Sequence, residues 1–245
     1  RLVRGQPEPV RPASIDPSAS YLVTGGLGAL GLQVATWLGN QGATHLVLTG
    51  RRGVTQAAQR SVLEQLAASG VTVQVAELDV ADEAGMRRLF AELQTSQAPL
   101  RGVFHCAGVL DDGILLNQSW KRFEGVLRAK VVGGWLLHEL TRELDLMVFF
   151  SSAAALLGNP GQGSYAAANA FLDGLACLRR QQGLPGLSIQ WGAWAGEGMA
   201  ARVGSTLPNL LPPLCFDLAA APWPVAGADA IVAINVLHYS PWSTT

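Results

Sequence analysis

The residues with the clearest chemical potential are a serine, a tyrosine and an asparagine in the second half of the sequence. Ser152 ends an apolar run, Tyr165 follows it thirteen positions later, and Asn169 lies four positions beyond the tyrosine. On a helix, a spacing of four places two side chains on the same face. A serine can donate a hydrogen bond to a carbonyl oxygen while a tyrosine donates a proton to it. This set therefore predicts a reaction at a carbonyl group.

A tyrosine that works as an acid near neutral pH needs a positive charge beside it, because its ordinary pKa is about 10. A lysine four positions after the tyrosine would supply that charge, but Asn169 holds this position. The whole sequence contains two lysines, Lys121 and Lys130. We expect Lys130, in a helix over residues 123–140, to provide the charge and Asn169 to form a polar link. A solvated Lys130 is the alternative, and we expect Lys121 to lie at the surface.

A glycine-rich segment, residues 24–31, follows a short apolar run and precedes an apolar pattern of helical spacing. Its GxGxxG motif permits a tight turn and a close approach of the backbone to a pyrophosphate, which would lie at the amino end of the helix. A glycine-rich turn without a ligand is the alternative. The residues expected to form the dinucleotide site are Thr24, Gly25, Gly26, Leu27, Gly28, Leu30 and, at the motif's end, Gly31.

The end of the second expected strand indicates which nucleotide binds. An NAD site, or a site for S-adenosylmethionine, would carry an acidic residue there, but this sequence has Arg51 and Arg52. Two arginines can clamp a 2′-phosphate, so the predicted cofactor is NADPH; a solvated basic turn is the alternative. Asp79 follows the third strand and is expected either to accept from the adenine amino group or to cap a nearby helix. The remaining expected cofactor contacts are Val80, Ala107 and Gly108.

The elements that must position these residues alternate regularly along the chain. Between the strand-like runs lie helix-length segments with apolar residues three and four positions apart. This alternation predicts an α/β fold: a Rossmann-like, doubly wound parallel sheet with helices on both faces, in three α/β/α layers. The apolar, strand-like runs are residues 21–24, 45–49, 71–78, 101–106, 146–151 and 187–191.

Composition limits the functional classes. Of 245 residues, 49% are hydrophobic and 14% charged, which excludes a disordered chain, and the net charge of −1 provides no basic field for nucleic acid. The three cysteines are scattered, which favours free thiols over a disulfide frame or a metal site. No apolar run is long enough for a membrane span. We therefore expect a cytoplasmic domain over residues 21–204, a linker over 1–20 and a divergent tail over 205–245.

Several segments along residues 21–203 carry a family resemblance. They are residues 24–31, 48–53, 105–112, 128–131, 150–152, 161–171 and 191–194. Together they resemble the catalytic subdomain of ketoreductases in modular type I polyketide synthases, within the short-chain dehydrogenase/reductase superfamily. That family has the same exchange of lysine and asparagine, so the resemblance implies a catalytic tetrad of Lys130, Ser152, Tyr165 and Asn169.

The activity implied by this resemblance is NADPH-dependent reduction of a β-ketoacyl thioester to a β-hydroxyacyl thioester. The substrate would be tethered through phosphopantetheine to an acyl carrier protein, and other polyketide synthase domains would be further partners. The resemblance also implies a cofactor-free structural subdomain ahead of the catalytic one. Since residues 1–20 alone precede the first expected strand, we expect that subdomain to be missing from this sequence.

Family patterns also bear on the stereochemistry of the product. Leu110, Asp111 and Asp112 look like the motif of B-type domains, and Leu157 replaces the tryptophan of A-type domains. Ala167 stands where epimerising B-type members carry a proline. The resemblance thus implies a B1-type domain that makes a D-configured hydroxyl group. An exposed acidic turn is the alternative for the two aspartates.

Three further residues are expected on the substrate side, namely Gln162, Trp191 and Met199. Trp191 and Trp194 lie where this architecture places its substrate loop, although packing within the loop is the first interpretation for both. Met199 lies in a glycine-containing segment that suggests a lid. The histidine at position 105 is expected to position the backbone or contact the cofactor, not to act as a general base.

Other functions remain open at this point. A domain with an intact cofactor turn and an altered carboxyl end could bind NADPH and act as a spacer in a megasynthase. A stand-alone reductase of free carbonyls and a methyltransferase are less well supported, because Asn169 and Arg51 argue against them respectively. Residues 229–238 resemble either a strand and turn of a C-methyltransferase or a poorly matched last strand of the reductase.

Overall fold

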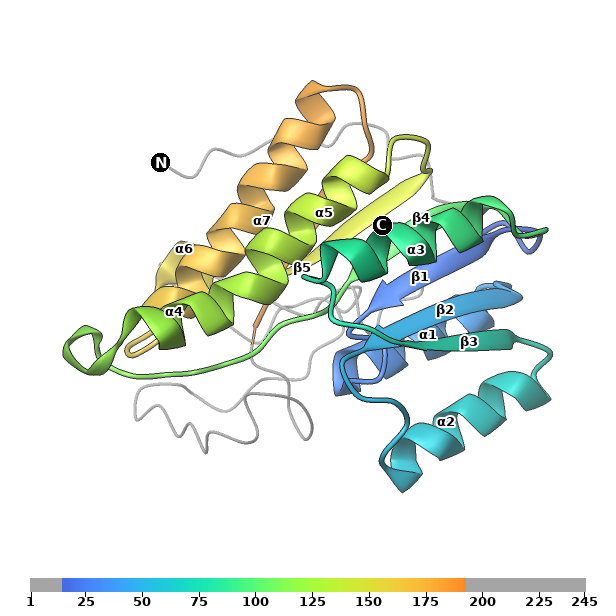
Figure 1. Ribbon diagram of the computed structural model, residues 1–245, viewed down its shortest axis with the longest axis horizontal. Helices are drawn as coiled ribbons and strands as arrows, with labels where there is room; N and C mark the ends of the chain where they lie inside the picture. Colours follow the sequence, from blue (N-terminus) through green and yellow to red (C-terminus); the bar gives the residue numbers. More distant parts are fainter. Residues whose placement is uncertain (1–14, 193–245) are drawn as a thin grey trace, which may run out of the picture.

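The computed structural model describes residues 15–192, which form one parallel sheet between two layers of helices (Figure 1). The strand order is β3-β2-β1-β4-β5-β6, and every neighbouring pair is parallel. This confirms the predicted doubly wound α/β fold. The strands are β1 (Ser20–Thr24), β2 (His45–Gly50), β3 (Thr72–Glu77), β4 (Leu100–His105), β5 (Leu146–Ser152) and β6 (Leu187–Trp191).

The helices connect these strands in the order that the apolar spacing predicts. The long ones are α1 (Ala29–Asn40), α2 (Ala57–Ala68), α3 (Glu83–Gln94) and α7 (Gly163–Gln181). Between β4 and β5 lie η1 (Leu115–Asn117), α4 (Trp120–Leu127), η2 (Arg128–Val132) and α5 (Gly133–Leu140), and the short α6 (Ala154–Leu157) follows β5.

Two apolar cores lie on the two faces of the sheet, because successive strand residues point to opposite faces. On one face, Tyr21 and Val23 of β1 pack with α1 and α2. On the other face, Leu22 of β1 packs with α3, α5 and α7. Both faces are covered, which explains why the central strands β1, β2, β4 and β5 read as nearly continuous apolar runs.

The topological switch point lies between β1 and β4, which are adjacent in the sheet but far apart in the sequence. Thr24 at the end of β1 is in register with His105 at the end of β4. In open parallel sheets, ligands bind in the crevice outside the carboxyl ends of the strands at this point. The fold therefore directs attention to the loops that follow β1, β4 and β5.

One predicted element differs in its geometry. The expected continuous helix over residues 123–140 is interrupted by η2, which is a π-helix, and its first part begins earlier, at Trp120. Beyond the π-turn, Gly133 packs closely on Val80 and Gly134 on Leu172 of α7, where a Cβ atom would clash. The π-turn contains Lys130, and π-turns within helices are frequent at functional sites.

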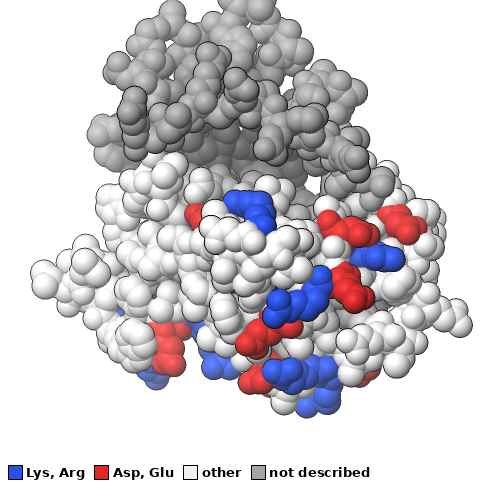
Figure 2. Space-filling model, turned by 90° about the horizontal axis from the view of Figure 1, so that it is seen from above, with Lys and Arg blue, Asp and Glu red and all other residues white. Residues whose placement is uncertain are grey.

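The surface charge is mixed. On the face shown in Figure 2, acidic and basic side chains lie side by side and form no large patch of one sign. Within residues 15–192, no helix has the length and apolar character needed to cross a membrane. The first strand begins at Ser20, so the last residue of the expected linker belongs to the sheet.

Candidate active site

Four predicted residues from three segments meet at the carboxyl edge of the sheet. Ser152 is the last residue of β5, and Tyr165 and Asn169 lie one turn apart in α7. The side chains of Ser152 and Asn169 lie close enough to the Tyr165 hydroxyl group to lower its pKa. Lys130 of η2 lies over the tyrosine ring, with Nζ 5.9 Å from the ring centroid. The structure therefore brings all four together.

Lys130 is a buried cation, with 3% of its surface exposed. Its Nζ donates a hydrogen bond of 2.7 Å to the carbonyl oxygen of Phe150. Burial lowers the pKa of Lys130 from 10.5 to about 8. A Cβ atom on Gly108 would lie 2.9 Å from Cε of this lysine, so the glycine leaves room for its side chain. The alternative of a solvated Lys130 is therefore wrong.

Opposing influences act on the pKa of Tyr165. Burial raises it most, and the negative charge of Asp112 raises it further, whereas the side chains of Ser152 and Asn169 lower it. Asn169 is fully buried, and its Nδ2 donates to the carbonyl oxygen of Tyr165 at 2.8 Å. Its Oδ1 is buried without a hydrogen-bond partner among the described residues.

His105 lies beneath this site and connects two strand ends. Its Nδ1 and the Thr24 hydroxyl are 2.7 Å apart, and both side chains are fully buried. Burial lowers the pKa of His105 to about 3, so the imidazole stays neutral near neutral pH. A histidine that does not exchange a proton near neutral pH is unsuited to general acid–base work. Its contact with Thr24, beside the glycine-rich turn, fits a positioning residue.

The glycine-rich turn is packed so closely that side chains would not fit. Gly25 has a φ of +66°, and a Cβ atom on it would lie 2.8 Å from the backbone of Ala107. A Cβ atom on Gly26 would lie 2.7 Å from the carbonyl oxygen of Val23. Gly28 is exposed and precedes α1, whose amino end has no side-chain cap. The backbone here forms a cradle that suits a phosphate group.

Arg51 and Arg52 lie exposed directly after β2, next to the glycine-rich turn. The turn is joined to the end of β2 by a hydrogen bond of 2.9 Å from Gly26 N to the carbonyl oxygen of Thr49. The Leu27 side chain lies close to Gly50, where a Cβ atom would be 3.5 Å from Cδ1. Both arginines are therefore near the cradle and accessible to an anionic ligand.

Asp79 follows β3 and does not cap α3. Its Oδ1 accepts a hydrogen bond of 2.9 Å from Ala81 N, and its Oδ2 lies 3.7 Å from Arg128 Nε. The residue in the cap position of α3 is Asp82. The helix-cap interpretation of Asp79 is therefore wrong, because the carboxylate closes a local turn instead. Val80 is buried and packs against Gly133 at the start of α5.

The two aspartates of the substrate-side motif are partly exposed, and each is bonded to a neighbouring side chain. Arg122 of α4 donates to Asp111 through Nε at 2.9 Å and also through Nη2, which lowers the pKa of the carboxyl group. Gln162 Nε2 donates to Asp112 Oδ2 at 2.9 Å. These bonds fasten the loop after β4, which includes Leu110, to α4 and to the beginning of α7.

The remaining substrate-side residues have different surroundings. Leu157 is 61% exposed at the end of α6. Trp191 stacks on Phe150, with ring centroids 5.5 Å apart, and its carbonyl oxygen accepts from Ala153 N at 2.9 Å. This geometry agrees with packing as the first interpretation of the tryptophan. Met199 and Trp194 lie outside the described residues, as does the tail over 205–245.

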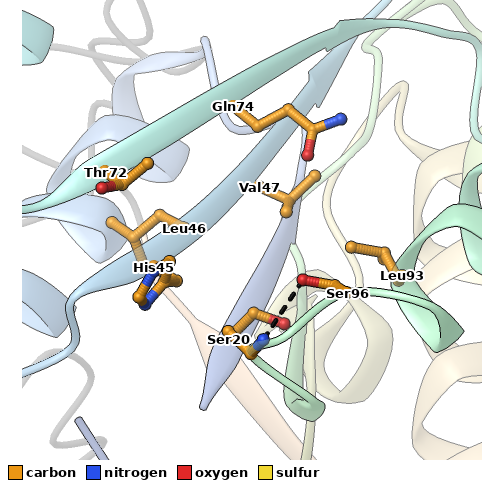
Figure 3. A pocket seen from close by; sticks show the side chains of 9 residues that line it. Ser20, His45, Leu46, Val47, Thr72, Gln74, Leu93 and Ser96 are labelled. Atoms are coloured by element: carbon orange, nitrogen blue, oxygen red, sulfur yellow. Dashed lines mark hydrogen bonds between the residues drawn. The ribbon is translucent and has the colours of Figure 1, made fainter. Parts of the chain in front are cut away.

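Two hollows in the described part of the chain lie away from this site. A cavity of about 70 Å³ lies at the amino ends of β1, β2 and β3, lined by Ser20, His45 and Thr72 among others (Figure 3). An open groove of about 410 Å³ lies between α3 and α5 and is lined by apolar side chains and two glutamates. A ligand pocket usually has about 300–1,000 Å³, so the cavity is too small for a dinucleotide.

Comparison with known families settles the relationship of the chain. A family model described as "KR domain" matches residues 19–196. The chain belongs to the KR domain family. Its relatives are polyketide synthases, and the solved structures that it resembles are ketoreductase domains of these enzymes.

Two relatives illustrate the level of similarity. The spectinabilin polyketide synthase system protein NorB of Streptomyces orinoci is 48% identical over 197 residues, which cover 78% of this KR domain chain and 9% of NorB. A protein of Mycobacterium tuberculosis described as "Putative inactive phenolphthiocerol synthesis polyketide synthase type I Pks1" is 47% identical over 190 residues, 76% of this chain and 12% of that protein. The chain thus spans about a tenth of these relatives.

Solved structures agree with the fold. A structure described as an A-type ketoreductase from a modular polyketide synthase is 44% identical, with a TM-score of 0.73, and the match covers 79% of this chain and 42% of that one. A C2-type ketoreductase is 30% identical, with a TM-score of 0.67, over 83% of this chain and 45% of that one. The KR domain chain spans less than half of the solved chains.

Sequence reasoning missed several bonded side chains in this KR domain. Arg122 and Gln59 each hold a loop of the site through three or more hydrogen bonds. Both lie on helices in positions that read as exposed polar surface. The signal that could have found Arg122 is the aspartate pair that needs a cation, whereas nothing local indicates Gln59.

Proposed function

We propose that this KR domain reduces a β-ketoacyl thioester, carried by an acyl carrier protein, to a β-hydroxyacyl thioester with NADPH as the reductant. The observation that carries the proposal is the convergence of Lys130, Ser152, Tyr165 and Asn169 beside a glycine cradle at the switch point. An acid, a hydrogen-bond donor and a cation in one place are what a ketone needs when it becomes an alcohol.

The residues present fit a phosphorylated dinucleotide. Gly25 and Gly26 let the turn pack closely on the backbone of Ala107 and Val23, where a Cβ atom would clash, and the turn leads into a helix start without a side-chain cap. Arg51 and Arg52 are exposed beside it and would hold the 2′-phosphate of NADPH. When bound, the reduced nicotinamide supplies a hydride to the carbonyl carbon.

The roles of the protein residues follow from their positions. Ser152 donates a hydrogen bond to the substrate carbonyl oxygen, and Tyr165 gives its hydroxyl proton to the same oxygen as the C–O bond loses its double-bond character. The buried charge of Lys130 favours the tyrosinate that remains, because an opposite charge nearby lowers the pKa of a phenol. Asn169 keeps the backbone at Tyr165 in place through its bond to the carbonyl oxygen.

The product that we propose is the D-configured alcohol of a B-type domain. Asp111 and Asp112 are supported as a structured motif by their bonds to Arg122 and Gln162, and Leu157 stands at the position of the A-type tryptophan. One of the solved structures that this chain resembles is an A-type ketoreductase. The chirality of the product would therefore distinguish this chain from that structure.

A second candidate function is a catalytically impaired domain that binds NADPH and acts as a spacer. The observation that favours it is the relative described as putatively inactive, which is 47% identical to this chain. Both functions use the same cofactor cradle, and they differ in turnover.

The experiment measures NADPH consumption by the full chain with a β-ketoacyl N-acetylcysteamine thioester, together with product chirality and NADPH binding. We expect turnover to a D-hydroxy product and a loss of at least about 100-fold in Tyr165→Phe, because the acid is removed. Binding of NADPH by Tyr165→Phe would show that the variant is folded and that the loss of turnover comes from the missing hydroxyl group. Binding without turnover in the unaltered protein would favour the spacer, and an L-hydroxy product would overturn the B-type proposal.

A further inference from the structure

Gln59 is a buried amide in the first turn of α2 with a partner for each end of its side chain. It is 9% exposed, although glutamine is usually a surface residue. Its Oε1 accepts hydrogen bonds from the backbone N–H groups of Thr55 at 2.8 Å and Gln56 at 2.9 Å. Its Nε2 donates to the carbonyl oxygen of Leu27 at 2.9 Å. The side chain is therefore fixed from two sides.

The partners of Gln59 belong to two loops that converge on the cofactor cradle. Leu27 lies within the glycine-rich turn, whereas Thr55 and Gln56 end the loop that begins with Arg51 and Arg52 after β2. We call the segment from Arg51 to Gln56 the arginine loop. Its beginning is held to the glycine-rich turn by the hydrogen bond from Gly26 N to the carbonyl oxygen of Thr49. Gln59 joins the far end of the loop to the same turn, so both ends of the loop are tied to the cradle.

We propose that Gln59 is a positioning residue for cofactor selection, which holds the arginine loop at the spacing that lets it read a 2′-phosphate while the glycine-rich turn holds the pyrophosphate. This inference rests on the proposed function, since it assumes that the cradle binds NADPH. Two arginines on a loop with both ends fixed lose less conformational entropy when they bind a phosphate. Gln59 does not touch the cofactor in this proposal; it acts through the two loops.

The test compares the binding of NADPH and NADH by the full chain and by Gln59→Met, which keeps the length of the side chain and removes all three hydrogen bonds. NADH lacks the 2′-phosphate and reports on the glycine-rich turn alone. We expect Kd for NADPH to rise about tenfold and Kd for NADH about twofold, which corresponds to the loss of one or two hydrogen bonds. The preference for NADPH therefore falls about fivefold.

Gln56→Ala is the matched control. Gln56 is exposed and lies at the cap of the same helix, so its replacement weakens the start of α2 and leaves the bond from Gln59 to Leu27 intact. Thermal unfolding of both variants measures their stability without cofactor. A merely structural role would make the two variants alike, with an equal loss of stability and an unchanged ratio of the two Kd values.

The outcomes separate this inference from the proposed function. If the unaltered protein binds neither dinucleotide, or prefers NADH, the proposed cofactor is wrong. If the unaltered protein prefers NADPH and Gln59→Met keeps the same preference, the cofactor stands and the role of Gln59 is overturned. A reduced preference in Gln59→Met with an unchanged preference in Gln56→Ala supports the inference.

Discussion

Lys130 and Arg179 are two buried cations that lie at opposite ends of the strands, Lys130 at the carboxyl ends and Arg179 at the amino ends. Lys130 lies at the carboxyl edge and bonds to Phe150 near the end of β5. Arg179, near the end of α7, bonds to Pro185 and Thr141, which precede β6 and β5. Their exposed fractions are 3% and 0%, and neither forms an ion pair within residues 15–192. Burial of a charge without a counter-charge is costly, so each must have a compensating reason.

Arg179 is surrounded by acceptors. Its Nε donates to the carbonyl oxygen of Pro185 at 2.7 Å, and Nη2 donates to that of Thr141 at 3.2 Å. Its Nη1 lies 3.1 Å from the Thr141 hydroxyl and 3.3 Å from His138 Nδ1. Burial lowers the pKa of Arg179 to about 10, so the guanidinium stays charged near neutral pH. This fork of donors ties three chain segments together and serves the fold.

Lys130 has fewer bonds and a pKa closer to neutrality. Its hydrogen bond to Phe150 and its position over the Tyr165 ring leave the ammonium close to the group whose proton moves in the proposed reaction. Burial brings its pKa to about 8. The difference shows which cation suits which role. A guanidinium can satisfy many acceptors and stays charged, so it suits a structural role, whereas the pKa of a buried ammonium shifts readily with its surroundings, which suits a role in proton transfer.

The sharpest test of this contrast is Lys130→Met. We expect the rate of thioester reduction to fall by about 100- to 1,000-fold, because the tyrosinate loses its neighbouring charge. The stability should stay the same or rise, since a buried charge is removed. Steady-state kinetics and urea unfolding measure the two effects. Lys121→Met, at the exposed second lysine, is the matched control and should change neither.

The pH dependence of stability provides a second readout for Lys130→Met. In the unfolded chain a lysine has a pKa near 10.5, and in the folded protein that of Lys130 is about 8. Between these two pKa values the unfolded chain binds a proton at this lysine more readily than the folded protein does. The free energy of unfolding is therefore highest above pH 10.5 and decreases as the pH falls towards 8. The unaltered protein should gain stability relative to the variant as the pH rises between these values, and parallel curves would contradict the assignment.

The second largest effect is expected for Arg179→Met. The carbonyl oxygens of Pro185 and Thr141 would lose their donors, which costs about 1–3 kcal/mol for each buried acceptor, partly offset by removal of the charge. We expect a net loss of about 2 kcal/mol in the free energy of unfolding, with unchanged activity per folded molecule. Arg180→Met is the control, because this exposed neighbour bonds to Gly186 where water can replace it. An equal loss in both variants would refute the structural role.

Each buried cation also lies against a glycine, so replacing that glycine by alanine should disturb the cation less than removing its charge. A Cβ atom on Gly108 would lie 2.9 Å from Cε of Lys130, and one on Gly186 would lie 2.8 Å from the carbonyl oxygen of Ala176 and 2.9 Å from Cβ of Arg179. Gly108→Ala should displace the flexible lysine and lower activity about tenfold with little loss of stability. Gly186→Ala should cost about 1–2 kcal/mol of stability and leave activity unchanged. Kinetics and unfolding of both variants check this, and a reversed pattern would break the comparison.

The two regions also differ in how far the sequence predicts them. All six strands were expected within two residues of their observed bounds. The central strands read as nearly continuous apolar runs because both their faces are covered, whereas the edge strands β3 and β6 alternate with polar residues. Tyr165 and Asn169 follow from helical spacing, and Lys130 was singled out because the sequence has a single other lysine. The carboxyl ends of the strands thus carry local motifs whose residue types and spacing indicate a chemistry.

The cluster around Arg179 carries no such motif. The sequence gives no reason to distinguish Arg179 from Arg180, yet the structure buries the first and exposes the second. Apolar periodicity reports which face of a helix is covered, but not which polar side chain finds acceptors on a distant segment. The amide bridge of Gln59 was missed for the same reason, since its bond to Leu27 joins segments far apart in the sequence. The π-turn at Lys130 was also missed, because apolar spacing does not distinguish it from a continuous α-helix.

The smallest expected effect concerns His138, whose ring must stay neutral beside Arg179. An arginine has no acceptor, so Nδ1 of His138 accepts from Nη1 and the ring proton is on Nε2. Burial, then the charges of Arg179 and Arg142, lower the pKa of His138 below 6.5, and Glu139 opposes them. Below pH 6.5 the unfolded chain therefore binds a proton at this histidine more readily than the folded protein does. The free energy of unfolding decreases as the pH falls through this range.

His138→Gln removes this titration and keeps an acceptor for Arg179. We expect the unaltered protein to lose more stability than the variant when the pH falls from about 7.5 to about 5.5, because only the unaltered protein carries this histidine. Urea unfolding at the two pH values measures the difference, and His45→Gln, which removes an exposed histidine, is the control. If His138→Gln loses as much stability as the unaltered protein, the neutral ring is not what holds the buried guanidinium, and the acceptors on Thr141 and Pro185 suffice.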